Sequence, residues 1–173
     1  MKKLIRRYHA WKSIGNVRLK IWATAEIAKK IGEELQKTGS NVDVKDVRRV
    51  EDLNDYETIV LGSALYMGFW RKEMARFVKK RAAELAQKKV WIFASGTTNE
   101  GDPVKDLEGR IYPPNLQPAM DIIKPVDVTA FHGAIDLEKL SGFEKWVMKK
   151  VDAPIGDFRD WEMISAWAKT IIQ

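Results

Sequence analysis

The chain contains no cysteine among its 173 residues and only two histidines, His9 and His132. Without cysteine it can form no disulfide, no thiolate nucleophile, no iron–sulfur site and no cysteine-ligated zinc site. No apolar run approaches the roughly 20 residues that a membrane-spanning helix requires. The basic N-terminus is not followed by the apolar segment of a signal peptide. The sequence therefore predicts a cytoplasmic protein without a metal site.

Acidic residues are absent from positions 1–20, and this imbalance accounts for the whole positive charge of the chain. Lys and Arg number 30 against 24 Asp and Glu, which gives a net charge of +6. Seven of the cations lie in the first twenty positions, so the rest of the chain is nearly neutral. Such a segment is typical of an arm that binds nucleic acid or an anionic membrane surface. It is equally compatible with an N-terminus that has no such role, and we expect no nucleic-acid partner.

The rest of the sequence alternates between strand and helix patterns. Apolar residues at helical spacing predict helices over residues 25–38, 71–87, 137–151 and 160–172. Alternating or β-branched runs predict strands over residues 41–47, 58–61, 90–94 and 126–131. Thr24 is expected to cap the first helix and Asp160 the last. Strands that alternate with helices indicate one parallel sheet covered on both faces.

Proline is concentrated in residues 96–125, which hold five of the six prolines of the chain. The sequence predicts a long irregular loop here, directly after the end of a buried strand. Loops of this length in compact domains are usually functional or disordered, and ligands gather at strand ends in open α/β sheets. The loop therefore either faces a substrate or partner, or is a plain surface excursion.

Small residues follow two of the predicted buried strands. The first segment runs Gly62-Ser63-Ala64-Leu65-Tyr66-Met67-Gly68-Phe69-Trp70, and the second runs Ser95-Gly96-Thr97-Thr98. Small side chains let backbone N–H and C=O groups approach a planar ligand, and Tyr66 or Trp70 can stack on its ring. Two such segments from neighbouring strands favour a cleft for a flat heteroaromatic cofactor. Each segment alone is also typical of a structural turn.

The order of these pieces carries a resemblance to a known family. The pieces are residues 25–46, 61–70, 91–96, 130–135 and 156–161, the last followed by Trp167-Ala168. Together they resemble, over residues 23–173, the flavodoxin-domain group related to menaquinone-dependent protoporphyrinogen dehydrogenases. The resemblance implies a flavodoxin-like α/β fold, a doubly wound sheet of five parallel strands in the order 2-1-3-4-5 with a long loop after strand 4. It implies FMN as the cofactor, held by Thr24, Ser63, Ala64, Tyr66, Gly68, Trp70, Ser95, Gly96, Thr97 and Thr98. Residues 156–161 receive no catalytic role.

Residues 1–22 depart from that family and form a separate, aberrant basic segment. Flavodoxin-like proteins open with a buried strand and a phosphate loop of Ser/Thr, Tyr/Asn, Gly and Thr, whose hydroxyl and N–H groups hold the FMN phosphate at a helix N-terminus. Residues 17–24 offer only Thr24, contain no glycine, and have Trp22 where bare backbone is expected. The alternation within residues 17–21 predicts a strand with one solvated face, unlike a central strand buried on both.

The genetic code offers an explanation for this departure. Lys20-Ile21-Trp22 is encoded by AAR-ATH-TGG; read one base later, with the G of the Ala23 codon, it gives Lys or Arg, then Tyr, Phe or Ser, then Gly. In that frame residues 13–22 are compatible with Val-Leu-Val-Thr-Tyr-Ala-Ser-Lys-Tyr-Gly, which is the strand and phosphate loop of the family. We therefore predict that most of residues 1–22 are out-of-frame translation. The other interpretation is divergence with loss of phosphate binding.

Three functional hypotheses follow. The main one is an FMN-dependent oxidoreductase or electron-transfer protein that serves a redox partner protein, a quinone or a porphyrinogen-like substrate. The nearly neutral body favours an enzyme over the acidic flavodoxins that steer toward partners by charge. The second is a degenerate flavodoxin-fold protein without cofactor, and the third a nucleic-acid or membrane binder that uses residues 1–20. No acid–base pair in the sequence identifies a catalytic residue.

Overall fold

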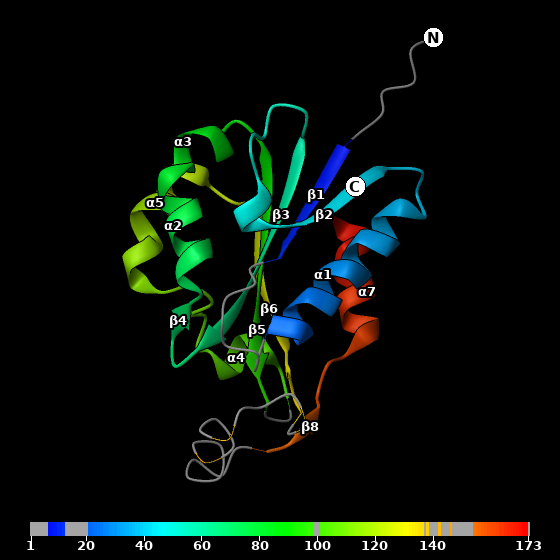
Figure 1. Cartoon of the computed structure of the whole chain (residues 1–173), viewed down its shortest axis with the longest axis vertical. Helices are drawn as coiled ribbons and strands as arrows, with labels where there is room; N and C mark the ends of the chain where they lie inside the picture. Colours follow the sequence, from blue (N-terminus) through cyan, green and yellow to red (C-terminus); the bar gives the residue numbers. More distant parts are fainter. Residues whose placement is uncertain are drawn as a thin grey trace.

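The fold is built around five parallel strands. The computed structural model describes residues 7–12, 21–98, 101–136, 138, 142, 146 and 154–172. The parallel strands lie in the order β2-β1-β3-β5-β6 (Figure 1), and the short β4 (Phe69–Trp70) pairs antiparallel with β3. Numbered among themselves, the parallel strands follow the predicted order 2-1-3-4-5. Their bounds are β1 Arg7–Lys12, β2 Asn41–Asp46, β3 Thr58–Tyr66, β5 Lys89–Thr97 and β6 Asp127–His132.

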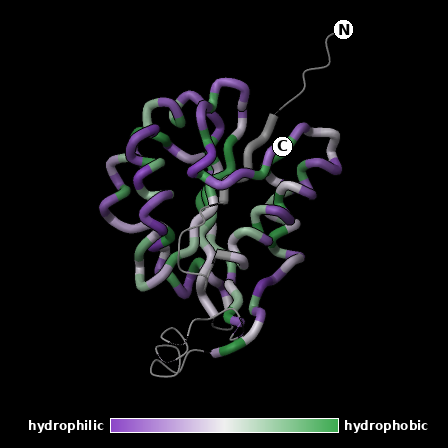
Figure 2. Tube along the Cα trace, in the orientation of Figure 1, coloured by the Kyte–Doolittle hydropathy of each residue, from purple (hydrophilic) through white to green (hydrophobic). Residues whose placement is uncertain are grey.

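Helices cover both faces of this sheet (Figure 1). One face carries α1 (Ile21–Gln36) and α7 (Trp161–Thr170). The other carries α2 (Lys72–Lys80), α3 (Ala82–Leu85) and α5 (Gln117–Ile123). Since successive side chains of a strand point to opposite faces, Val60 of β3 packs in the α1–α7 cluster while Ile59 and Leu61 pack in the other. Figure 2 shows the resulting concentration of apolar residues on the central strands, with hydrophilic residues on the outer helices.

An aromatic cluster anchors α7 to the sheet. The Trp167 ring lies edge-on to Trp91, Phe93 and Phe131, with centroid separations of 5.8, 6.1 and 5.6 Å. Its indole N–H donates to the Asp127 carboxylate at 2.6 Å. Burial of aromatic side chains in such edge-to-face contacts is a large stabilising contribution, so the C-terminal helix is a full member of the core.

Two predicted helices differ from the observed ones. The helix predicted over residues 25–38 is α1, which begins at Ile21, so Thr24 lies in its first turn and does not cap it. The strand predicted over residues 17–21 is not confirmed at Ile21, which is helical, and residues 17–20 lie outside the described part. The strand between β2 and β3 is formed by Arg7–Lys12. The helix predicted over 71–87 is interrupted at Arg81, whose φ of −111° and ψ of 18° leave the helical region.

The strands predicted over 58–61 and 90–94 both continue further, to Tyr66 and Thr97. Small residues such as Ser63 and Ser95, for which the sequence predicts loops, therefore belong to strands. The reason is that β3 and β5 stay paired as far as Ala64 opposite Ser95. The other predicted strands correspond to β2 and β6, with η1 (Val47–Arg49) following β2. Asp160 caps α7 as predicted, since its carboxylate accepts from the N–H groups of Glu162 and Met163.

The proline-rich segment is more regular than predicted. It contains α4 (Pro103–Asp106), η2 (Pro114–Leu116) and α5, each with proline in its first turn. Proline is favoured there because its missing N–H has no helical partner anyway. The helix predicted over 137–151 falls largely outside the described residues. Among those described, no helix is long and apolar enough to cross a bilayer.

Glu34 provides a test of α1 through pH. The residue is 7% exposed and its carboxylate pairs with Lys37 at 2.8 Å and Lys30 at 2.9 Å. Hydrogen bonds from both lysines lower the pKa of Glu34 from 4.5 to about 2. Because the pKa of Glu34 is lower in the folded state than in the unfolded state, its ion pairs contribute fully to the free energy of unfolding above pH 4.5. This contribution is lost as the pH falls toward 2. We expect Glu34→Gln to reduce the free energy of unfolding at pH 7 by about 1–2 kcal/mol, after allowance for the exposed lysines.

Urea titrations of both proteins between pH 7 and pH 2.5 measure this difference. The matched control is Glu33→Gln, since Glu33 is half exposed and its pair with Lys29 is long, at 3.6 Å. That change should cost less than about 0.5 kcal/mol. A Glu34→Gln difference that stayed constant over the whole pH range would contradict the account.

Candidate cofactor-binding site

The first part of the site is a tight hairpin between β3 and β4. Leu65 pairs with Trp70 and Tyr66 with Phe69, which leaves a two-residue turn of Met67 and Gly68. Their φ angles are 49° and 79°, and positive φ at both central positions is the signature of a type I′ turn. The turn leaves the side chains of Tyr66, Met67 and Phe69 exposed, at 42%, 80% and 67%. An accessible aromatic and apolar tip thus stands at the carboxyl end of β3.

The second part is the end of β5, which lies directly beside the end of β3. Ala64 is the register partner of Ser95. Both predicted segments therefore lie at the same edge of the sheet, as the sequence indicated. The sheet ladder continues on the other side to β6, with a register shift between Ser95 and Thr97.

Two glycines allow the strand ends to approach more closely than side chains permit. A Cβ on Gly96, whose φ is +151°, would lie 2.3 Å from the carbonyl oxygen of Leu65. A Cβ on Gly133 would lie 3.2 Å from the Cα of Gly96. Gly133 also donates its N–H to the Thr97 carbonyl at 2.8 Å and accepts from the Phe158 N–H at 3.1 Å. The backbones of β3, β5 and the segment after β6 are therefore packed against one another without intervening side chains.

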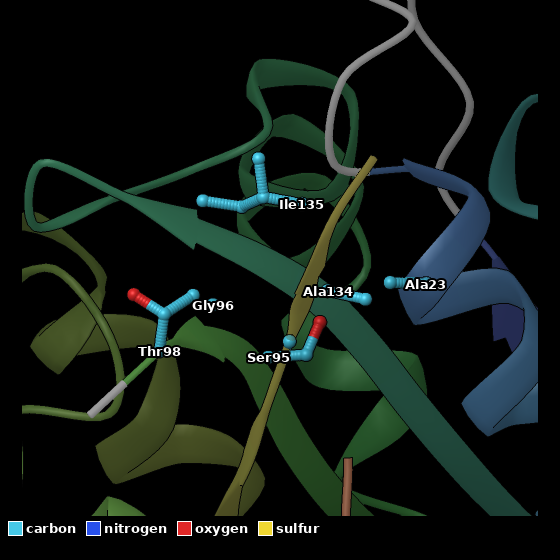
Figure 3. A pocket seen from close by; sticks show the side chains of 7 residues that line it. Ala23, Ser95, Gly96, Thr98, Ala134 and Ile135 are labelled. Carbon is cyan, nitrogen blue, oxygen red and sulfur yellow. The ribbon is translucent and has the colours of Figure 1, made fainter. Parts of the chain in front are cut away.

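A shallow pocket opens at this edge (Figure 3). Its cavity volume is about 10 Å³, which is room for about one water molecule, and every side chain that lines it is small or apolar. The segment after β6 contributes β7 (Ala134–Ile135), which pairs antiparallel with β8 (Gly156–Asp157). The lining residues are Ala23, Ser95, Gly96, Thr98, Gly133, Ala134 and Ile135.

The N-terminus of α1 is fastened to the pocket by a buried hydrogen bond. The Thr24 and Ser95 hydroxyl oxygens are 2.6 Å apart, and the two side chains are 2% and 3% exposed. Ala23 places the first turn of the helix on the pocket wall. Because the first four N–H groups of a helix have no partner within it, this arrangement places the donor end of α1 at the same edge.

Other predicted site residues are placed differently. Trp70 is 5% exposed, donates its indole N–H to the Ile111 carbonyl at 2.9 Å, and meets Tyr112 edge-on. It therefore anchors the proline-rich segment, and of the two predicted stacking residues Tyr66 offers the accessible ring. The Ser63 hydroxyl is buried and accepts from the Arg71 N–H at 3.3 Å, which ties the start of α2 to β3.

Thr97 is held by His132, which the sequence did not link to it. The Thr97 hydroxyl and the His132 Nδ1 are 3.0 Å apart, and His132 Nε2 is 3.0 Å from the Gly101 carbonyl oxygen. Because a carbonyl can only accept, Nε2 carries a proton and donates. The imidazole thereby connects β5, β6 and the start of the proline-rich segment.

A charged cluster lies beside the same end of α1. Arg159, whose side chain is 4% exposed, pairs with Glu26 of α1 and with Asp157 of β8, both at 2.6 Å. Burial opposes the charged guanidinium, but hydrogen bonds to Asp157 and Glu26 outweigh that effect and raise its pKa. Sequence reasoning gave Arg159 no role, and it missed Ala23, Gly133, Ala134 and Ile135 of the pocket. The small pair Gly133-Ala134 directly after a predicted strand was the available signal.

An open parallel sheet with a pocket of small residues at its carboxyl edge defines a doubly wound α/β protein of the kind that binds nucleotide cofactors. The family model of the flavodoxin domain matches residues 23–160. The chain belongs to the flavodoxin-domain family, and FMN is the cofactor of that family.

Individual relatives are distant. The protoporphyrinogen IX dehydrogenase (quinone) of Escherichia coli K12 is 22% identical over 163 residues, which cover 86% of this chain and 87% of that protein. Among solved structures, oxidised Flavodoxin 2 from Bacillus cereus has a TM-score of 0.57 at 18% identity and covers 96% of this chain and 97% of its own. A mutant flavodoxin from Fusobacterium nucleatum bound to flavin mononucleotide has a TM-score of 0.50 at 14% identity, with 97% and 96% covered.

The close approach at Gly96 gives a direct test of this edge. Gly96→Ala places a methyl group against the Leu65 carbonyl and should lower the free energy of unfolding by about 3 kcal/mol. Gly68→Ala is the matched control, because Gly68 also has positive φ but a methyl group there would have no atom within 4 Å. It should cost only about 1 kcal/mol of backbone strain. Chemical denaturation measures both, and equal losses would show that the close packing is unimportant.

Proposed function

We propose that this chain is an FMN-dependent electron-transfer protein or oxidoreductase. The isoalloxazine ring would lie between the β3–β4 hairpin and residues 95–98, and the phosphate at the N-terminus of α1. The observation that carries the proposal is that three separate segments meet at one sheet edge: Ser95 lies opposite Ala64 in the ladder and hydrogen-bonds to Thr24 of α1.

The residues at this edge have the chemistry that FMN requires. The pocket wall carries no bulky side chain, because Gly96, Gly133 and Ala134 line it, and Tyr66 offers an exposed aromatic face at the hairpin. The first turn of α1 contains no acidic residue, which suits an anion at the positive end of the helix dipole. FMN, when bound, supplies one- and two-electron redox chemistry. The chain supplies binding and orientation, with the Gly68 backbone available at the exposed turn.

The substrate we favour is a porphyrinogen-like molecule, with a quinone as electron acceptor, in the cytoplasm. The likeness to the E. coli protoporphyrinogen IX dehydrogenase over most of both chains supports this choice. The nearly neutral charge of residues 21–173 also supports it, since flavodoxins that shuttle electrons use strongly acidic surfaces for steering. A redox partner protein is the other recipient of electrons that the family suggests.

Flavin titration tests the cofactor directly. We expect the purified chain to quench FMN fluorescence with saturation, because the ring becomes stacked at the hairpin. FMN should bind more tightly than riboflavin, which lacks the phosphate. A colourless chain that leaves the fluorescence of millimolar FMN unchanged would support the cofactor-free alternative.

We further propose that the missing phosphate loop reflects out-of-frame translation of most of residues 1–22. The family model begins to match at residue 23, and the predicted frame change lies between Trp22 and Ala23. The central position between β2 and β3 is occupied by Arg7–Lys12, whose sequence Arg-Tyr-His-Ala-Trp-Lys includes two charged residues and a histidine. Central parallel strands are normally continuous apolar runs. Coding DNA whose codons cannot yield the shifted peptide would end this proposal.

Replacement of residues 13–22 by Val-Leu-Val-Thr-Tyr-Ala-Ser-Lys-Tyr-Gly tests the same idea in the protein. We expect FMN affinity to rise about 100-fold, the equivalent of two charge-assisted hydrogen bonds to phosphate. The melting temperature should rise with it, because an apolar strand enters the sheet centre. A scrambled peptide of the same composition is the control. If the intended and scrambled peptides changed FMN affinity equally, the proposal would be wrong.

A further inference from the structure

Arg159 stands at the junction of β8 and α7 in an almost closed environment. Its side chain is 4% exposed. The guanidinium binds Asp157 through Nε at 2.7 Å and Nη2 at 2.6 Å, and binds Glu26 through Nη1 at 2.6 Å. It also lies over two indole rings, 4.7 Å from the centroid of Trp22 and 4.4 Å from that of Trp161. Two carboxylates and two aromatic faces thus fix one cation.

Two of these partners belong to the start of α1. Trp22 and Glu26 lie four residues apart, on one face of the helix and about 6 Å along its axis. Between them is Thr24, which hydrogen-bonds to Ser95 on the pocket side. Arg159 therefore holds the outer side of the same helical turn whose inner side meets the pocket. The residue before Arg159 also contacts the pocket wall, because the Phe158 N–H donates to the carbonyl of Gly133 at 3.1 Å.

The charge balance at this position matters for an anion. Asp157 and Glu26 are about half exposed, at 47% and 49%. With Arg159 the cluster carries one net negative charge, and without it two. Loss of the Arg159 charge would make the surroundings of the first turns of α1 more negative, and so less favourable for a phosphate dianion.

We propose that Arg159 is a positioning residue for the phosphate end of the cofactor site. It docks the start of α1 against β8 and offsets one of the two negative charges of Glu26 and Asp157, so that the helix N-terminus stays more attractive to a phosphate group. This role rests on the proposed FMN binding, and it assigns a function to the Gly156–Trp161 motif.

The test compares two ligands that differ only in the phosphate. FMN and riboflavin are titrated by fluorescence quenching into the unchanged chain, Arg159→Gln and Arg159→Lys. For Arg159→Gln, FMN affinity should fall about tenfold at low salt and less in 0.5 M salt, because salt screens the exposed carboxylates. Riboflavin affinity should change less than twofold. Arg159→Lys keeps the charge and should lose less than Arg159→Gln.

A second variant does not depend on removing the buried cation. Glu26→Gln keeps a side-chain oxygen that can accept from Arg159 Nη1 and removes one negative charge, so FMN affinity should rise about threefold with riboflavin unchanged. Arg159 would be only a structural contact if Arg159→Gln lowered the affinity for FMN and riboflavin equally, together with the melting temperature. The same conclusion would follow if Glu26→Gln did not raise FMN affinity. If the unchanged chain bound neither flavin, the proposed function would fail, and this role with it. Tight FMN binding with an unchanged FMN-to-riboflavin ratio in the variants would overturn this role alone.

Discussion

The close approach of three backbones at Gly96 is the constraint on which the site depends. Leu65, Gly96 and Gly133 come from three different strand ends, and a single Cβ at the central position would collide with a carbonyl oxygen at 2.3 Å. Because no side chain separates these segments, their peptide groups form one continuous wall at the carboxyl edge of the sheet. The β3–β4 hairpin begins at the same edge of the sheet, although none of its residues is among those that line the pocket. A flat ligand meets backbone and small side chains there, which suits an aromatic ring better than a branched or highly charged molecule.

The start of α1 completes this edge, and it is held from two sides. On the pocket side Thr24 shares a buried hydrogen bond with Ser95. On the outer side Arg159 joins Glu26 to Asp157 and brings the C-terminal part of the chain to the same turn. Segments more than 130 residues apart in sequence therefore determine where the helix N-terminus lies. The position of an anion at that terminus depends on both contacts.

Sequence patterns predicted the framework and the edge of the sheet at which the pocket lies. The β-branched run at Thr58–Leu61 and the apolar run at Val90–Ala94 identified adjacent central strands, and the small residues after them identified the edge where the pocket lies. What the sequence could not indicate is set by contacts between distant residues. Trp70 is part of the core because the Ile111 carbonyl accepts its N–H. The helix break at Arg81 could not be predicted, because no proline or glycine stands near it in the sequence. The role of Arg159 could not be predicted either, because its partner Glu26 is 133 residues away in the sequence.

A crystal structure of the chain with FMN tests the central claim most directly. The account predicts electron density for the isoalloxazine between the Tyr66–Phe69 turn and residues 95–98, with the phosphate at the first turn of α1. Density for the ring at any other edge of the sheet, or a phosphate directed away from α1, would contradict it.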